Sequence, residues 1–543
     1  RSDQFYPANH LKFNTEQELQ KKGSYQINEG ESQTMNYDFS LNFSRQVKEL
    51  HYLFGFLSYS LDETTYEENI YKAEGFPSDR MNSIFFARQY AEDTKPQGAE
   101  STTRNIGVNA VFNYSYDDRL LFDATFRTNA SSQFGANQRW GNFWSLGAGW
   151  NMHNEKWLRS KEWFSRLKLR ASVGSTGSQG NNAYQSLATY NYSEKNYENK
   201  LGAYLMGMEN KDLKWQKKMD YNVGMDMSVK NNFNLVFDYY QSTTENLLVA
   251  FTLPPSTGFT TVQENVGKVR NTGIELSMSY MVLSHPQDRT FLTLSLRAAH
   301  NKNRVVKISD SMKAYNEKMD EMAESDSKLV TKYYDGVSMN AIWAVRSLGI
   351  DPATGREIYL TKDGVSTYEY RAEDMVVCGD NLPKLRGSFG INLGYKGFGL
   401  NVMCMYELGA KMYNETLVDR VENVNMSYAV DKRVLEGRWQ KPGDKVRFRS
   451  LKQVWDPEKQ AYKVDEKTYA TSRFVQKKNE LNISSINFSY DFFRHAFVKK
   501  MGMERLSVAF YMNDVAKLST IKTERGLSYP FARNYNFSLQ MTF

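Results

Sequence analysis

Apolar and polar residues alternate with a period of two in many separate segments of this chain. The segments 120–127, 219–229 and 534–543 show the pattern most clearly, each with apolar residues at every second position. Successive side chains of a β-strand point to opposite faces, so each such segment places one face of a strand in an apolar medium. This repeated alternation indicates an all-β protein and constrains the fold more than any other feature of the sequence.

The alternation alone does not separate a soluble β-sandwich from a membrane β-barrel. The chain has no run of about 18 consecutive apolar residues, the length that a membrane-spanning helix needs. Its mean hydropathy of −0.63 would suit a soluble protein, but only alternate residues of a barrel strand meet lipid. Phe, Trp and Tyr make up 14% of the residues and Pro only 11 of 543. This composition favours strands and suits the aromatic girdles of membrane barrels.

The lengths of the connections discriminate better between these two folds. The pattern predicts about fifteen strands, near 33–45, 48–61, 101–116, 119–131, 139–152, 164–175, 216–230, 232–244, 266–282, 289–302, 384–396, 398–410, 479–493, 503–514 and 533–543. Short links are expected at 46–47, 117–118, around 231, at 284–288 and at 397, and long links at 62–100, 176–215, 245–265, 303–383, 411–478 and 515–532. Outer-membrane barrels have tight periplasmic turns and long extracellular loops. The sequence therefore predicts a transmembrane antiparallel up-and-down β-barrel.

Three connections need separate treatment. Residues 132–138 are short for an extracellular link, whereas residues 153–163 are long for a periplasmic one and are expected to hold a helical turn at 155–159. Residues 80–90 could form a strand, but that strand would place the tight turn at 117–118 on the extracellular side. We therefore assign 80–90 to a loop with a short helix.

One predicted strand changes phase along its length. The apolar residues Leu481 and Ile483 are at odd-numbered positions, whereas the apolar residues that follow, Ile486 and Phe488, are at even-numbered positions. A β-bulge at 484–485 would restore the lipid-facing side, and bulges are common in barrels. A misplaced strand boundary is an equally good explanation at this point.

An odd count of about fifteen strands leaves two unpaired edges, which lipid does not tolerate. Bacterial barrels normally have an even number of strands, and plugged transporters reach about 22. We therefore expect residues 33–543 to form the C-terminal part of a barrel and residues 1–32 to be an extracellular segment. A further polypeptide would supply about seven strands and a plug, and no signal peptide opens this chain at Arg1.

Several segments, in order along nearly the whole chain, resemble one known family. They are 113–121 (NYSYDDRLL), 131–135 (SSQFG), 157 with 167–177 (LKLRASVGSTG), 271–276 (NTGIEL), 351–355 (DPATG) and 529–535 (YPFARNY). As a set these segments resemble the C-terminal two-thirds of the barrel in SusC/RagA-type TonB-dependent transporters of Bacteroidota. Gly135 and Gly273 within them are expected to permit tight backbone at strand ends.

The resemblance implies a 22-stranded barrel in the outer membrane of a Gram-negative bacterium, and several partners. These are an N-terminal plug-bearing half of the same transporter with its TonB box, the TonB complex, a SusD-like lipoprotein lid and outer-membrane lipid. Two transporter–lid pairs could also associate as a dimer. The implied function is energised uptake of oligosaccharides or oligopeptides, with no covalent chemistry.

The final strand carries a second resemblance. Its apolar face resembles the signal that the outer-membrane insertion machinery reads, although Phe543 could equally fill the periplasmic aromatic girdle. The residues of this barrel-insertion signal are Tyr535, Phe537, Leu539, Met541 and Phe543.

Two loops contain candidate contact residues. Within 303–383, the candidates for stacking on sugar rings or holding peptide backbone are Tyr333, Tyr334, Asp335 and Trp343. Aromatic residues also stabilise long loops by packing, and we favour packing for these four. The loop 245–265 is apolar for an exposed segment, which suggests a lid or partner interface or packing into the barrel mouth. Its residues that would form this interface are Leu247, Leu248, Phe251 and Phe259.

No catalytic or metal-binding constellation is evident in the sequence. The six histidines are scattered singly, and Cys378 and Cys404 lack metal-ligand partners at suitable spacing. We interpret Cys404 as an apolar strand residue and Cys378 as an isolated loop thiol. Asp351 lacks the spaced carboxylates of a calcium loop, so a turn is the better interpretation of 351–355. We expect no cofactor and no enzymatic activity.

The charge balance argues against nucleic-acid binding. The formal charge is only +7, because 69 Lys and Arg face 62 Asp and Glu, and no dense basic run appears. Three hypotheses remain: an importer, a barrel that serves as an adhesin or structural surface protein, and a membrane hydrolase. The hydrolase lacks a catalytic cluster. The chain is expected to be part of a nicked, genetically split or longer transporter.

Overall fold

The computed structural model covers residues 1–543 and describes all of them outside a set of short segments. The segments not described are 14, 17, 92–94, 160–162, 179–182, 193–197, 199, 201, 253–260, 327–328, 425–430, 451–452, 457–460, 465–467, 493–494 and 523–532, together with the side chains of 248–252, 261–266, 310–311, 325–326, 453–456 and 461–464.

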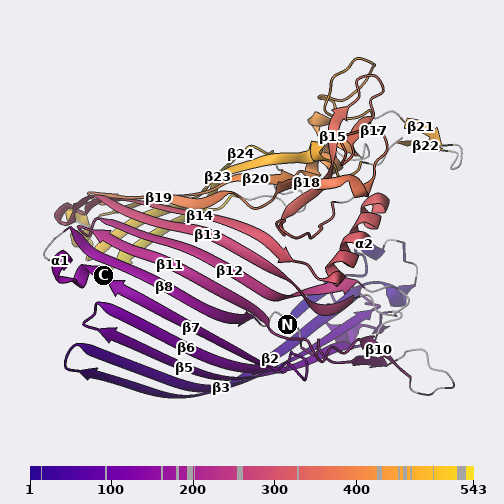
Figure 1. Ribbon diagram of the computed structural model, residues 1–543. Helices are drawn as coiled ribbons and strands as arrows, with labels where there is room; N and C mark the ends of the chain where they lie inside the picture. The colour runs from indigo at the N-terminus through magenta and orange to yellow at the C-terminus, as the bar shows by residue number, and fades with distance from the viewer. Residues whose placement is uncertain are drawn as a thin grey trace.

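One curved antiparallel sheet forms most of the molecule (Figure 1). Its long strands are β2 (Ser24–Val47), β3 (His51–Glu74), β5 (Gln97–Tyr116), β6 (Leu120–Ser131), β7 (Trp140–Asn151), β8 (Phe164–Ser178), β11 (Gln216–Val229), β12 (Phe233–Thr252), β13 (Thr261–His285), β14 (Thr290–Lys307), β19 (Leu385–Tyr395), β20 (Phe398–Tyr413), β23 (Val475–Asp491), β24 (Arg505–Ser519) and β25 (Tyr535–Thr542). Short strands β1 (Ser2–Tyr6) and β4 (Gln89–Tyr90) pair with β2 and β3. Each long strand pairs with the next long strand along the chain, so all fifteen predicted strands are present in up-and-down order.

The tight turns lie at or next to the predicted positions. The first lies at 48–50 and not at 46–47, because β2 continues to Val47. Asp117 and Asp118 both have positive φ, 51° and 50°, between β5 and β6. Lys396 and Gly397, at 46° and 100°, form the two-residue connection between β19 and β20. Two consecutive residues with positive φ give a turn whose twist matches that of the flanking strands. Figure 1 shows the short turns at the end of the sheet where the C-terminus also lies.

Several strands are longer at the other end than the alternation predicted. β2 begins at Ser24 rather than near 33, and β12 and β13 remain paired as far as Thr252 and Thr261. The predicted loop 245–265 is therefore largely strand, which corrects the sequence interpretation. The physical reason is that the hydrogen bonds between the strands continue above the membrane. No lipid contacts the strands there, so neither face has to be apolar. The pattern that reveals a strand in lipid disappears there.

The phase change in β23 is a β-bulge. Ile483 pairs with Cys404 and Ser485 pairs with Met403, so Ser484 has no opposite residue on β20. Its Oγ donates a hydrogen bond to the Met403 carbonyl at 2.9 Å. The predicted bulge at 484–485 is confirmed, and it keeps Phe488 on the apolar face beside Leu400.

The sheet is open along β2 and β25 in the described part of the chain. β25 pairs only with β24, and from Glu29 onward β2 pairs only with β3. All residues of β25 are exposed, and the relative exposure of Phe537 reaches 79%. The fifteen long strands therefore form an open sheet with two unpaired edges in the described residues.

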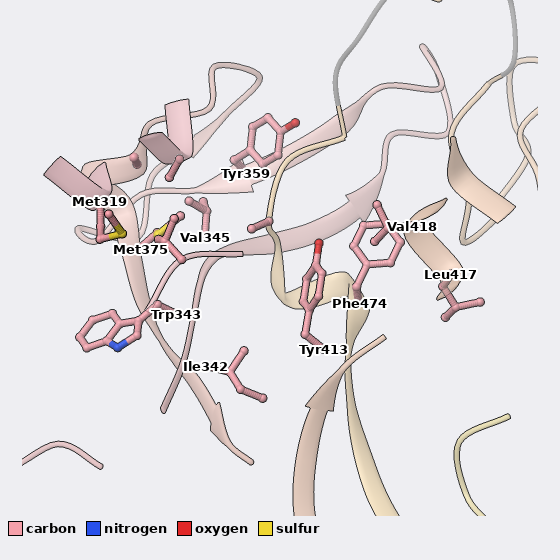
Figure 2. Packing of buried hydrophobic residues seen from close by; sticks show 14 of the residues in the cluster. Met319, Ile342, Trp343, Val345, Tyr359, Met375, Tyr413, Leu417, Val418 and Phe474 are labelled. Carbon is pink, nitrogen blue, oxygen red and sulfur yellow. The ribbon is translucent and has the colours of Figure 1, made fainter. Parts of the chain in front are cut away.

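A separate unit covers the end of the sheet opposite the tight turns. We call it the extracellular module; it comprises the described residues of 308–383 and 411–474. It contains α2 (Asp310–Asp326), a four-stranded sheet of β15 (Ala341–Ile350), β16 (Glu357–Leu360), β17 (Ser366–Thr367) and β18 (Met375–Asp380), and the π-helix η9 (Leu417–Glu422). Figure 2 shows its apolar core, in which Trp343, Met375 and Phe474 come from different parts of the two loops.

The remaining elements are short. They are β9 (Thr189–Tyr192), β10 (Ala203–Gly207), β21 (Gln453–Asp456), β22 (Ala461–Val464), α1 (Lys156–Arg159), α3 (Ala496–Lys500), and the 3-10 helices η1 (Leu11–Phe13), η2 (Leu19–Lys21), η3 (Ile84–Phe86), η4 (Met152–Asn154), η7 (Pro286–Asp288), η8 (Ala372–Asp374), η10 (Lys432–Val434) and η11 (Ser472–Phe474). α1 and η3 confirm the helical turns expected within 153–163 and 80–90. None of the helices in the described residues is both long and apolar enough to cross a membrane.

Gly135 and Gly273 both lie so close to neighbouring atoms that a side chain would not fit. A Cβ added to Gly135 would lie 2.1 Å from the carbonyl oxygen of Lys211, so only glycine fits this link between β6 and β7. Gly273 lies in the interior of β13, not at a strand end as predicted. There an added Cβ would lie 2.5 Å from the ring of Tyr240, which occupies the space above the glycine.

Candidate functional site: the lumen wall and the extracellular module

The inner face of the sheet carries a row of charged residues across nine strands. We call these residues the lumen charge belt: Arg170, Asp226, Asp238, Glu275, Arg297, Arg386, Glu407, Lys478, Glu480 and Lys517. The register places Asp238 opposite Glu275, Arg386 opposite Glu407, and Glu407 opposite Glu480. Residues directly opposite each other on neighbouring strands point to the same face of the sheet. The residues of the lumen charge belt occupy the polar face of their strands. The inner wall at this level can therefore contact charged and polar groups.

The two ends of the belt are ion-paired. On one side Arg170 contacts Asp226 at 3.1 Å and Asp238 at 2.6 Å. On the other side Lys478 contacts Glu407 at 3.0 Å, and Lys517 contacts Glu480 at 2.6 Å. These pairs link neighbouring strands and fix the rotamers of long side chains.

A buried arginine joins the two loops of the extracellular module. Arg473 Nη2 lies 2.8 Å from Glu357 Oε2 and 2.7 Å from Glu422 Oε1. Thr471 Oγ1 donates a further hydrogen bond of 2.8 Å to Glu357 Oε1. Burial opposes the charge of Arg473, but the two carboxylates outweigh burial and raise its pKa above the ordinary value. No sequence pattern indicates this centre, because its members are far apart in the chain.

A second arginine satisfies carbonyl groups in the same module. Arg438 donates hydrogen bonds to the carbonyl of Val434 at 2.9 Å, to that of Arg449 at 2.8 Å, and to that of Val421. Burial, with the neighbouring cations, lowers the pKa of Arg438, while Glu422 opposes this shift. Arg438 therefore fixes the backbone around η9 without forming an open binding site.

Three of the predicted substrate-contact residues, Tyr333, Tyr334 and Asp335, lie between α2 and β15, and the fourth, Trp343, lies on β15. Trp343 is buried, Tyr333 is half-buried, and Tyr334 and Asp335 are exposed. The rings of Tyr334 and Trp343 are 5.0 Å apart, and Asp335 Oδ1 accepts a hydrogen bond from the Ile308 amide at 2.8 Å. The structure thus brings these four residues together. Of the three aromatic residues, Tyr334 has the most exposed side chain.

Sequence reasoning missed the residues that hold this group in place. Lys332 is buried, forms an ion pair with Asp320 of α2, and lies 5.6 Å from the Trp343 ring centroid. Asn316 accepts a hydrogen bond of 2.9 Å from the Tyr333 amide and donates one of 2.6 Å to its carbonyl. The four-residue spacing of Met312, Asn316 and Asp320, which places them on one helix face, is the signal that could have identified these contacts.

The segment 351–355 is a tight turn, as the sequence indicated. Asp351 accepts hydrogen bonds from the Ala353 amide at 2.9 Å, Thr354 Oγ1 at 2.6 Å and Tyr368 OH at 2.8 Å. The hydrogen bond from Thr354 is the largest of the effects that lower the pKa of Asp351. Its oxygens are therefore used within the turn, and Trp439 Nε1 donates to the Pro352 carbonyl at 2.9 Å to attach the turn to the second loop.

The predicted interface residues are only partly described. Leu247 is half-buried and lies on β12, as do Leu248 and Phe251, whose side chains are outside the described set; Phe259 lies outside the described residues altogether. The insertion-signal residues Tyr535, Phe537, Leu539, Met541 and Phe543 are all exposed at the open edge of β25. Both roles remain predictions.

The cysteines and histidines show no shared site among the described residues. Cys404 is buried in β20, as expected, but Cys378 lies in β18 and not in a loop, which corrects the sequence interpretation. Its Sγ is 3.4 Å from the Ala344 carbonyl, because β18 pairs directly with β15. No three His, Cys, Asp or Glu side chains in the described residues are grouped to hold a metal ion.

Comparison with known proteins gives a consistent result. Residues 1–431 match the family described as TonB dependent receptor-like, beta-barrel. The chain is 24% identical over 546 residues to TonB-dependent receptor P39 of Formosa agariphila, an alignment that covers 90% of this chain and 50% of that protein. It is 28% identical over 301 residues to TonB-dependent receptor SusC of Bacteroides thetaiotaomicron, covering 52% of this chain and 29% of SusC.

Solved structures share the fold. The RagAB peptide importer in its closed-closed state superimposes with a TM-score of 0.80 at 19% identity, covering 96% of this chain and 57% of that one. The chain spans about half the length of the curated relatives it matches. The family match and the antiparallel sheet place the protein in the outer membrane of a Gram-negative bacterium. The chain is similar in sequence to SusC and in fold to RagAB, and it belongs to the TonB dependent receptor-like β-barrel family.

Proposed function

We propose that this chain forms the larger part of the barrel of an outer-membrane importer that takes up oligosaccharides or oligopeptides. The observation that carries the proposal is an open sheet with an apolar outer face and a charged inner face, in a chain of the TonB-dependent receptor family. Such a wall suits a hydrated passage enclosed by further strands. The importer would bind, enclose and release its substrate without covalent chemistry.

Further polypeptide would complete the barrel at β2 and β25. An N-terminal half of the transporter would supply the remaining strands, a plug and the segment that engages the TonB complex. The two unpaired edges support this part of the proposal, because exposed strand edges are not stable in lipid. The first 32 residues would then lie on the extracellular side.

A SusD-like lipoprotein would close the extracellular mouth. The likeness to SusC and to RagAB supports a partner of this kind, and two transporter–lid pairs could form a dimer. On this proposal Leu247, Leu248, Phe251 and Phe259 are candidate lid contacts, and Tyr334 and Asp335 are candidate substrate contacts. Tyr333 and Trp343 would support them from within the module.

The proposal is tested by uptake. Cells that carry the complete transporter gene, a deletion of that gene, or the gene without a functional TonB are given labelled oligopeptides and oligosaccharides in parallel. We expect accumulation of one substrate class only in the first strain. Equal accumulation in all three strains would reject import, and loss of cell attachment in the deletion strain would then favour an adhesin.

The partners are tested by purification. Proteins that co-purify with the chain from detergent-solubilised outer membrane are identified by mass spectrometry. A plug-bearing polypeptide and a SusD-like lipoprotein are expected. Isolation of the chain with neither would contradict the proposed assembly.

A further inference from the structure

The middle of the lumen charge belt differs from its two ends. Glu275 on β13, Arg297 on β14 and Arg386 on β19 form no ion pair with any other described residue, although charged residues flank them on both sides. All three are exposed on the inner wall. Two guanidinium groups therefore face the lumen without an ion pair of the kind that Arg170, Lys478 and Lys517 form.

The two arginines are close neighbours. Arg297 lies opposite Ser388, and Arg386 lies opposite Ala299, so they are diagonal partners on adjacent strands. Diagonal positions on one face have Cα atoms about 7–8 Å apart, within reach of one ligand for long side chains. Both positions are fixed by ladder hydrogen bonds, not by a loop.

Backbone packing beneath the pair limits how it can rearrange. A Cβ at Gly387, between the two arginine positions, would lie 1.9 Å from the carbonyl oxygen of Arg297. Tyr406 donates a hydrogen bond of 2.9 Å to that same carbonyl. The strand that carries Arg297 is thus held closely against β19 and β20.

A cavity of about 550 Å³ lies at these residues, large enough for a ligand group several atoms across. Its lining includes Arg297, Arg386 and Glu275, together with Asp238, Glu407 and the apolar Met405. The cavity is therefore lined by two cations without an ion pair, by acidic groups and by an apolar side chain.

We propose that Arg297 and Arg386 form a carboxylate-binding site on the lumen wall. Guanidinium groups bind carboxylates and phosphates through paired N–H donors. The acidic Asp238, Glu275 and Glu407 around this cavity repel a doubly charged phosphate more strongly than a singly charged carboxylate. Glu275 also provides a contact for a cationic group on the same ligand.

The carboxylate can come from two sources. One is an acidic side chain of polypeptide that occupies the lumen in the complete transporter, and the other is a free ligand that passes along the wall. Both present the same group to the same two arginines. The site is independent of whether the protein imports a peptide or a glycan.

The test is arginine footprinting of the complete transporter in detergent. Phenylglyoxal modifies guanidinium groups that are free of an anion, and mass spectrometry of peptides reports the rate at each arginine. Arg127, an exposed arginine on the inner face of β6 that lies outside the cavity, is the internal control. Reactions are run alone, with N-acetylalanine, with N-acetylalanine amide, and at high salt.

If the carboxylate is a free ligand, Arg297 and Arg386 react as fast as Arg127 in the absence of additives. N-acetylalanine then slows both by at least about tenfold, as expected for a charge-assisted hydrogen bond, and its amide does not. If polypeptide supplies the carboxylate, both arginines are already protected, and high salt raises their rates while that of Arg127 stays constant.

Two results would overturn the proposal. In the first, all three arginines react alike under every condition. In the second, Arg297 and Arg386 react slowly under every condition, and neither salt nor carboxylate changes their rates. Such protection would come from burial and not from a bound anion. Because the readout is modification and not uptake, either result leaves the import proposal to its own test.

Discussion

Arg473 Nη2 lies 2.8 Å from Glu357 Oε2, although the two residues are separated by 116 positions in the sequence. Glu357 lies on β16, in the connection between β14 and β19, whereas Arg473 lies at the end of the connection between β20 and β23. Both side chains are almost fully buried. The ion pair therefore joins two long loops that the chain order alone leaves independent.

Replacement of Arg473 by Met should detach the second loop from the module. The substitution leaves the carboxylates of Glu357 and Glu422 buried without their cation, and breaking a buried ion pair costs about 3–5 kcal/mol. Protease cleavage within 411–474 and hydrogen exchange of β15 should both become faster. The transmembrane strands should retain their protection, because none of their ladder hydrogen bonds is changed.

Arg371 provides the matched control. It contacts Glu369 at 2.9 Å and Glu373 at 3.8 Å, but all three side chains are exposed. Exposed pairs contribute about 0–1 kcal/mol, so Arg371→Met should leave cleavage and exchange nearly unchanged. Equal effects of the two substitutions would contradict the role given to Arg473.

The extent to which the sequence predicted the fold depends on where each strand lies. Within lipid, one face of every strand must be apolar, and the alternation identified all fifteen long strands and the bulge at Ser484. Above the membrane this requirement ends. The first residues of β2 and the last residues of β12 were therefore assigned to loops, although their ladders continue.

The pH dependence of the turn at Asp351 follows from its hydrogen bonds. Donation from Thr354, the Ala353 amide and Tyr368 lowers the pKa of Asp351 below its ordinary value of 3.8. A carboxyl group with a lowered pKa in the folded state stabilises the fold above its ordinary pKa. That contribution is lost as the pH falls from 3.8 through the lower folded value, so the turn should open only in acid.

Trp439 reports this opening, because its Nε1 donates to the Pro352 carbonyl and its ring lies against Gly355. Replacing the other tryptophans by Phe isolates its fluorescence, and the acid transition should then appear below pH 3.8. Asp351→Asn in this background should remove the transition. A transition of the same midpoint in both proteins would refute the assignment to Asp351.

The candidate site was less predictable than the fold. Tyr333, Tyr334, Asp335 and Trp343 are near one another in sequence, so their grouping could be inferred. Lys332 was overlooked because a single lysine carries no periodic signal, and the partners of Arg473 come from another loop. In the lumen, the strand register decides which charged side chains can form ion pairs. The sequence alone therefore does not distinguish Arg170, which is ion-paired, from Arg386, which is not.

Tyr334 and Trp343 should respond differently to truncation. Tyr334 is exposed, so Tyr334→Ala should preserve the module and weaken binding of the transported substrate. Trp343 is buried beside Lys332, and Trp343→Ala removes a large core side chain at a cost of about 3–5 kcal/mol. Hydrogen exchange of β15 and substrate affinity, measured on the same preparations, should separate the two effects.

A loss of affinity in Tyr334→Phe as large as in Tyr334→Ala would assign the contact to the hydroxyl group instead of the ring. Unchanged affinity in both variants would exclude Tyr334 from the substrate site. The packing role of Trp343 would be unaffected by either outcome, because its measurement is the exchange rate.

Deletion of Ser484 should leave the barrel able to form. Without the extra residue, Ile483 and Ser485 become consecutive opposite Cys404 and Met403, so Phe488 stays on the apolar face and Asn487 on the lumen face. Ser484→Ala is the control, because it retains the bulge and loses only the hydrogen bond of 2.9 Å to Met403, worth about 1 kcal/mol. The measurement is the amount of folded barrel in the outer membrane, detected by its heat-dependent mobility in detergent gels. Loss of the folded form after the deletion would show that the bulge itself is needed for barrel formation.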